Sequence, residues 1–310
     1  MGISRSTLLW MSENKWMKRN VPKWWFVRKA LKKFMPGESV ESALQATQTF
    51  VYLGIPTVFT KLGENITSLN EAQSVKEHYL NVINKIAERN LNVELSVKLN
   101  QLGFDFSFEE TLKNFGEIVA KAKAKLNNTV FIDMEGSNYT QRTIDFYKTA
   151  KGKLDNIGLC VQAYLYNTEK VIDELIPIFP SIRLVKGAYK ESSEIAFPGK
   201  VQVDENYYRL AQKLMNAAKA NPIRVIFATH DNQLISKIIE DSKLTGLASS
   251  KLEFQMLYGI KPALQKQLAK SGFKVRVLIA YGDSWYPWYM RRLAERPANI
   301  WFVIKNIFSS

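Results

Sequence analysis

Short apolar runs alternate with longer amphipathic stretches along most of the chain, and this alternation constrains the fold more than any other feature. The runs are rich in β-branched residues and lie at 57–59, 95–97, 130–132, 158–161, 182–185, 225–228, 252–254 and 275–279. Apolar residues recur at helical spacing between them, in the stretches 71–89, 109–126, 138–151, 168–178, 205–220, 232–240 and 261–271. Such alternation forms parallel βαβ units, and strands that are apolar throughout are buried on both faces. Eight such strands predict an α/β protein with a closed (β/α)8 barrel, and an open doubly wound sheet is the alternative.

Length and composition limit the class of protein. The 310 residues suffice for one barrel of roughly 250 residues and a short extension. Hydrophobic residues make up 46% and charged residues 23%, which excludes disordered, collagen-like and disulfide-stapled chains. The single cysteine, Cys160, cannot form an internal disulfide, as is typical of a reducing compartment. No apolar run reaches the ~20 residues that cross a bilayer. We therefore expect a cytoplasmic protein.

The N-terminal segment differs from the rest in charge. Residues 1–36 carry nine basic side chains and one acidic one, so they hold more than half of the net charge of +14. Six aromatic residues lie among them: Trp10, Trp16, Trp24, Trp25, Phe26 and Phe34. We expect a basic aromatic helical arm over 1–38 and a catalytic domain over 39–310. The arm either lies on anionic lipid at the inner face of the cell membrane or packs on the barrel with a solvated basic face.

Polar residues follow several predicted strands at the end where barrel enzymes place their active sites. They are Lys98, Asp133, Gln162, Lys186 and the run Thr229-His230-Asp231. Each one alone suits a turn or a helix cap, but their convergence on one rim indicates a site. A non-catalytic protein that binds nucleic acid or membrane through its basic arm is the alternative, and it leaves this polar rim unexplained. We expect no specific nucleic-acid partner.

Arg183 lies inside an apolar strand, where an unpaired guanidinium is costly to bury. Two interpretations remain open for it: an internal ion pair with Asp133 or Glu135, or a cation directed at a bound anion or an electron-rich ring.

A second polar cluster contains Arg291, Arg292 and Glu295, which share one helix face. Adjacent guanidiniums beside aromatic rings suit the capture of a small carboxylate. The chain has no G-x-G-x-x-G fingerprint, no P-loop and no Cys/His spacing typical of a metal site, so no metal is expected.

Seven colinear motifs resemble those of monofunctional bacterial proline dehydrogenases, from about residue 50 to the end. They are LSVKLNQLGFDFS at 95–107, IDMEGSNY at 132–139, VQAYL at 161–165, RLVKGAY at 183–189, ATHD at 228–231, EFQMLYG at 253–259 and MRRLAERPAN at 290–299. The resemblance implies a modified (β/α)8 TIM-like barrel with FAD at the C-terminal ends of the strands. It also implies oxidation of L-proline to 1-pyrroline-5-carboxylate, with hydride transfer from C5 to flavin N5 and reoxidation by a membrane quinone.

The resemblance also implies roles for individual residues. Arg291 and Arg292 would clamp the substrate carboxylate, with Lys98 and Asp133 as a charged floor. The remaining substrate-binding positions would be Glu64, as a gate residue that pairs with the first arginine, and Tyr189, Leu257 and Glu295. The flavin-binding positions would be Gln162, Arg183, Lys186, Gly187, Ala188, Thr229 and His230.

Two positions depart from the family pattern. Leu278 in the last strand and Trp288 before the arginine pair stand where tyrosines are usual. Both family tyrosines line the substrate ring, so hydroxyproline or another cyclic secondary amino acid is the alternative substrate.

Overall fold

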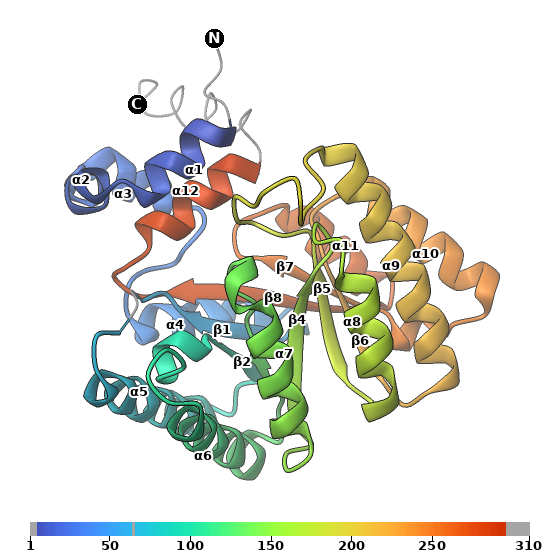
Figure 1. The fold of residues 1–310 in the computed structure, drawn as a ribbon, viewed down its shortest axis with the longest axis horizontal. Helices are drawn as coiled ribbons and strands as arrows, with labels where there is room; N and C mark the ends of the chain where they lie inside the picture. The colour runs from blue at the N-terminus through green and yellow to red at the C-terminus, as the bar shows by residue number, and fades with distance from the viewer. Residues whose placement is uncertain (1–4, 64–65, 296–310) are drawn as a thin grey trace.

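The computed structural model describes residues 5–63 and 66–295, and its centre is a closed barrel of eight parallel strands (Figure 1). The strands are β1 (Thr57–Lys61), β2 (Val93–Val97), β3 (Val130–Ile132), β4 (Ile157–Gln162), β5 (Ser181–Val185), β6 (Arg224–Ala228), β7 (Glu253–Leu257) and β8 (Lys274–Tyr281). Neighbours pair in chain order, and β8 closes the barrel on β1 with Thr57 opposite Val277. The predicted barrel is confirmed, and the open sheet is wrong for this chain.

Eight helices form the outer layer. They are α4 (Val40–Val51), α5 (Leu69–Glu88), α6 (Phe108–Leu126), α7 (Ser137–Lys151), α8 (Thr168–Leu175), α9 (Lys200–Ala220), α10 (Asn232–Thr245) and α11 (Pro262–Lys270). Side chains of Ser39, Ser68, Ser107 and Asp231 cap four of their N-termini. The helix expected over 168–178 is shorter, because Pro177 lies in a separate 3-10 turn. The helix expected from 205 begins earlier, at Lys200.

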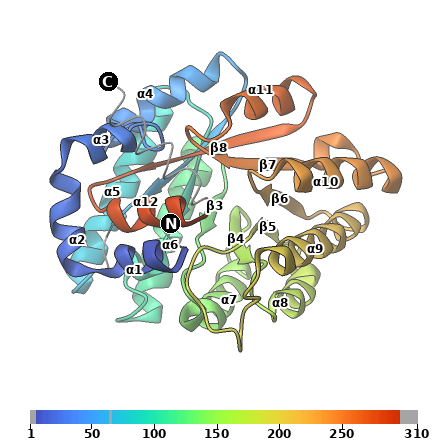
Figure 2. The same ribbon diagram turned by 90° about the horizontal axis from the view of Figure 1, so that it is seen from above.

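Three helices precede the barrel: α1 (Arg5–Glu13), α2 (Lys15–Asn20) and α3 (Trp25–Leu31). Figure 2 shows α1 beside α12 (Tyr286–Glu295), the helix that follows β8. Apolar residues of these helices form a core separate from the one around the barrel. Its buried members include Leu8, Leu9, Leu31, Met35, Trp285, Tyr286, Tyr289 and Leu293. One face of the predicted arm is thus packed against the last helix. No helix in the described parts of the chain is long and apolar enough to cross a bilayer.

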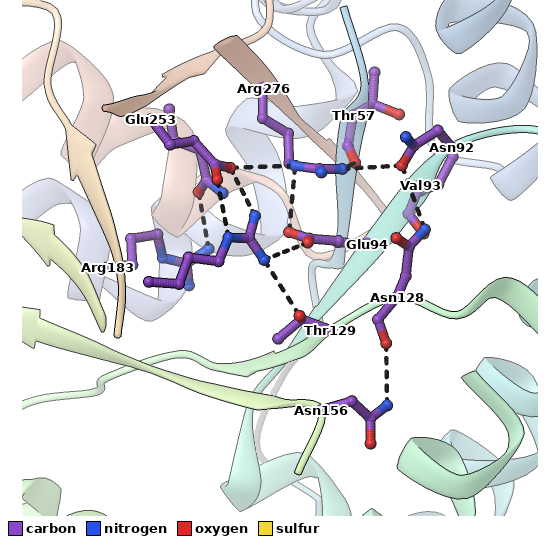
Figure 3. Close-up of polar contacts among 12 residues, drawn as sticks. Thr57, Asn92, Val93, Glu94, Asn128, Thr129, Asn156, Arg183, Glu253 and Arg276 are labelled. Carbon is purple, nitrogen blue, oxygen red and sulfur yellow. Dashed lines mark hydrogen bonds and ion pairs between the residues drawn. The ribbon is translucent and has the colours of Figure 1, made fainter. Parts of the chain in front are cut away.

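A network of charged side chains fills the barrel near the N-terminal ends of its strands (Figure 3). Arg224 bonds to Glu94 at 2.6 Å and to both oxygens of Glu253 at 2.7 and 2.9 Å. Arg276 lies 3.3 Å from Glu94 and 3.4 Å from Glu253. Barrel interiors are usually filled by branched apolar side chains. Here two acids and two arginines replace them, and their charges cancel.

Candidate active site

Asp133 and Arg183 form a buried ion pair above this network. Asp133 follows β3 and also accepts hydrogen bonds from Ser96 at 2.7 Å and Thr60 at 3.2 Å. The guanidinium of Arg183 donates to Ser96 at 2.8 Å and lies 5.1 Å from the Phe131 ring centroid. Of the two carboxylates considered for Arg183, the structure therefore selects Asp133. The pair leaves the charge of Arg183 inside the barrel, below the rim.

A second polar unit lies at the rim and links three elements. Lys98, directly after β2, forms an ion pair with Glu135. The other oxygen of Glu135 accepts a hydrogen bond from the Tyr189 hydroxyl at 2.7 Å. The Tyr189 ring in turn lies 5.2 Å from the guanidinium carbon of Arg291 on α12. Lys98 and Asp133, expected to form a floor together, thus have different ionic partners.

Burial and charge act against each other at Lys98. Burial is the largest single influence and lowers the pKa of its ammonium group, but Glu135, Tyr189 and Asp133 together outweigh it, with Glu135 contributing most. The pKa of Lys98 is therefore raised above its ordinary value. At Tyr189, burial disfavours the charged phenolate and so raises the pKa of the phenol. Lys98 stays a cation and Tyr189 a neutral donor at physiological pH.

Polar contacts within the protein hold three of the cofactor positions expected from the sequence. Lys186 contacts Asp204 at 2.5 Å and Asp231 at 3.0 Å. His230 accepts a hydrogen bond from the Leu257 backbone at 2.8 Å, and the Thr229 hydroxyl accepts one from the Asp231 backbone at 3.1 Å.

Gly187 and Ala188 lie in the loop after β5. Gly187 has φ +112°, and a Cβ there would lie 2.3 Å from the Tyr164 ring. Glycine is therefore required at this turn.

The side-chain amides of two buried glutamines test whether this rim fits a flavin. Gln162 Oε1 and Gln255 Nε2 have no hydrogen-bond partner among the described residues, although buried polar groups nearly always have one. One is an acceptor and the other a donor, which matches the alternating edge of a flavin pyrimidine ring. Gln255 also accepts from Arg183 at 3.4 Å. Sequence reasoning missed Gln255, and its signal was a polar side chain inside the apolar run of β7.

Helix α12 places Arg291 beside the Tyr189 ring and Arg292 beside Trp288, whose ring centroid is 6.0 Å from the Arg292 guanidinium carbon. Leu278 and Leu257 are paired neighbours on β8 and β7. Leu278 packs against the core that contains Trp288.

Two expected site residues cannot be compared with this geometry. Glu64 lies outside the described residues, and for Glu295 only its place at the end of α12 is described. Glu135 was considered only as a partner for Arg183, and its position between Lys98 and Tyr189 became visible through the fold.

Known proteins of one family resemble this chain along most of its length. The family model described as proline dehydrogenase matches residues 43–305. The chain belongs to the proline dehydrogenase family. Proline dehydrogenase 2 of Bacillus subtilis (strain 168) is 37% identical over 305 residues, covering 98% of this chain and 99% of that protein. Proline dehydrogenase of Deinococcus radiodurans is 35% identical over 280 residues, covering 89% of each.

Solved structures share the barrel of this proline dehydrogenase family member. Proline utilization A from Bdellovibrio bacteriovorus superposes with a TM-score of 0.80 at 21% identity, over 98% of this chain and 39% of that longer one. A bifunctional proline utilization A protein gives a TM-score of 0.72 at 25% identity, over 89% of this chain and 32% of the other. The chain therefore spans about a third of these larger proteins.

Proposed function

We propose that the protein oxidises L-proline to 1-pyrroline-5-carboxylate. The observation that carries the proposal is the rim unit of Lys98, Glu135 and Tyr189, set against Arg291 in a chain of this family. In this reaction the C5–H bond breaks with its electron pair, the amine loses a proton, and a C5=N bond forms. Bound FAD would supply the hydride acceptor.

The cations at the rim bind the substrate's carboxylate. Arg291 and Arg292 offer planar forks that grip a carboxylate through paired hydrogen bonds. Lys98 presents a point charge from the opposite side, at the end of β2. Since α12 carries both arginines and covers the rim, the same helix binds the substrate and excludes water from it.

The residues that would hold FAD come from the interior and rim of the barrel. Gln162 and Gln255 would satisfy their unpaired amide atoms on the pyrimidine edge, and Thr229 and His230 would lie along the ribityl–pyrophosphate chain. Arg183 would favour reduction, because a fixed positive charge stabilises the negative charge that develops on the ring. Its own ion pair with Asp133 moderates this effect.

The wall near the substrate ring favours proline over its hydroxylated analogue. Leu278 offers only carbon where the family pattern has a phenol, so a ring hydroxyl beside it would be buried without a partner. Oxidation of hydroxyproline or another cyclic secondary amino acid is the second candidate, supported by the same two substitutions.

Reoxidation by a membrane quinone would require contact with a lipid surface, and the arm is suited to it. The outward-facing indoles of Trp10, Trp16 and Trp25 are 59%, 62% and 67% exposed. They lie among the basic residues of α1 to α3, so the surface combines indole rings with positive charge, as interfacial segments do. We place the protein in the cytoplasm, at the inner face of the membrane.

Two assays test these proposals. A dye-coupled oxidation assay with proline, 4-hydroxyproline and pipecolate should give the highest kcat/KM with proline, and a flavin absorption spectrum should accompany the purified protein. Oxidation of none of the three, or a colourless active enzyme, would contradict the proposal.

Lipid contact is tested with anionic phosphatidylglycerol vesicles. The double variant Trp16→Ala/Trp25→Ala should co-sediment less than the natural protein, because two interfacial rings are lost. Tyr52→Ala is the matched control, since Tyr52 is 91% exposed outside the arm. Equal binding by all three proteins would exclude lipid contact through these indoles.

A further inference from the structure

Glu135 uses both oxygens of its carboxylate to join side chains from different elements. One oxygen pairs with Lys98 at the end of β2, and the other accepts from Tyr189 in the loop after β5. The side chains of Lys98 and Glu135 are only 16% and 15% exposed. Charged hydrogen bonds in such partly desolvated surroundings are stronger than those in open solvent.

The backbone around Glu135 is also held in place. Its backbone carbonyl oxygen accepts a hydrogen bond from the Gln162 side chain at 3.2 Å. Two residues later, the backbone amide of Ser137 donates a hydrogen bond to the Glu191 carboxylate at 2.8 Å. Two residues earlier, the Asp133 amide donates to the Val97 carbonyl at 2.9 Å. The carboxylate therefore projects from a fixed support, as a residue that orients others must.

We propose that Glu135 is a positioning residue that sets Lys98 and Tyr189 at the distance from Arg291 at which a substrate carboxylate is bound. This inference rests on the proposed function. Without the carboxylate, Lys98 would lose the ion pair it forms among residues 5–63 and 66–295, and its flexible stem would be free to move toward solvent. Tyr189 would lose the bond that keeps its ring against Arg291.

Charge makes a distinctive prediction for this role. The charged or titratable groups that act on Lys98 are Glu135, Tyr189 and Asp133, and Asp133 is already paired with Arg183. Removing the charge of Glu135 leaves burial to dominate, so the pKa of Lys98 should fall. Binding of a carboxylate ligand should then weaken at a lower pH than in the natural protein.

The test uses the FAD-loaded protein and cyclopentanecarboxylate, a ring carboxylate with no amine to oxidise. Isothermal titration between pH 6 and pH 10 gives the dissociation constant without turnover. Glu135→Gln keeps the shape and removes the charge. We expect about tenfold weaker binding at neutral pH and, toward pH 10, a further loss of binding that the natural protein does not show in this range.

Two further variants make the result specific. Glu117→Gln is the matched control, because Glu117 also pairs with a buried lysine, Lys76 at 2.7 Å, but on the outer helices α6 and α5; it should leave the pH profile unchanged. Tyr189→Phe removes the hydrogen bond to Glu135 and keeps the Lys98–Glu135 ion pair, so binding should weaken by a few fold with a smaller shift in pH dependence than Glu135→Gln gives.

Several outcomes would overturn the inference. If carboxylate binding by Glu135→Gln had the same pH dependence as binding by the natural protein, Glu135 would not hold Lys98. If that variant does not fold, unchanged binding by Tyr189→Phe would refute the link. If the natural protein neither binds the carboxylate nor oxidises proline, the proposed function itself fails. If the natural protein is active and Glu135→Gln binds the carboxylate equally well, only the positioning role is contradicted.

Discussion

Two charged networks occupy opposite ends of the same barrel, and they differ in how completely their members satisfy one another. Near the N-terminal ends of the strands, Glu94 and Glu253 each contact both Arg224 and Arg276. These four residues lie within strands, and the Glu94 side chain is 2% exposed. The network is closed and neutral, as expected of a group that maintains structure.

The network at the C-terminal ends extends beyond the strands. Asp133 and Glu135 both belong to the segment after β3, and Lys98 follows β2. The cations of α12 meet this network through the ring of Tyr189. Side chains on strands are held rigidly, whereas those after strands can adapt to a ligand. On the proposed function, similar ion pairs therefore serve stability at one end of the barrel and binding at the other.

The strongest test of the contrast removes an acid from the closed network. Although burial alone would raise the pKa of Glu253, Arg224 and Arg276 hold it below its ordinary value. Glu253→Gln leaves their charges unbalanced, and the free energy of unfolding should fall by about 3–5 kcal/mol. KM for proline should stay within about twofold. Chemical denaturation and steady-state kinetics measure the two effects.

Glu41→Gln is the control for this variant. Glu41 also contacts two cations, Lys85 and Arg89, but it is on the surface. Solvent screens such pairs, so its stability should change little. Equal loss of stability in both variants would mean that burial does not distinguish the closed network.

The converse variant, Arg291→Ala, should damage binding and spare stability. Loss of one cation from a partly buried carboxylate site costs roughly 2–5 kcal/mol, so kcat/KM should fall at least about thirtyfold. The melting temperature should change little, because the apolar face of α12 stays packed on the arm. Arg209→Ala, which removes a surface pair with Glu169, should alter neither. Normal kinetics in Arg291→Ala would exclude the clamp.

The wall formed by Leu278 and Trp288 should have a smaller effect, confined to substrate choice. Burying an unpaired hydroxyl costs roughly 1–3 kcal/mol, so kcat/KM for proline should exceed that for 4-hydroxyproline by about tenfold or more. Leu278→Tyr should crowd Trp288 and lower activity, and adding Trp288→Tyr should restore it. Additive effects in the double variant would show that the two side chains act independently.

A titrating pair near the rim should have the smallest effect. His78 bonds to the Tyr281 hydroxyl at 2.9 Å, and burial lowers the pKa of its imidazole to about 4. Between pH 6.5 and pH 4 the unfolded chain gains this proton and the folded one does not, so stability falls as the pH falls. His78→Gln should flatten that dependence by under about 1 kcal/mol, since solvent screens the half-buried ring. Denaturation at pH 7 and pH 5 checks it.

The alternation of apolar runs and helical stretches was sufficient to predict the barrel, because strand burial and helix amphipathicity are local patterns. The polar residues after five of the strands were also readable, since parallel strands bring those ends together. The pairing of Arg183 was narrowed to two carboxylates, because a buried guanidinium requires a counter-charge. These features needed only residue types and their order.

Tertiary structure alone decided which charges meet. Glu94 and Arg224 are separated by 130 positions in the chain. The charged residues near the starts of β2, β6 and β7 gave no sign in the sequence that they form one network. The same holds for Glu135, whose partners follow β2 and β5. The basic aromatic arm was evident from composition, but its division into a face on α12 and an exposed indole face depends on docking. Sequence determines which groups need partners, and the closure of the barrel decides which partners lie within reach, because ionic contacts act over a few ångströms in space, however far apart the residues are in the chain.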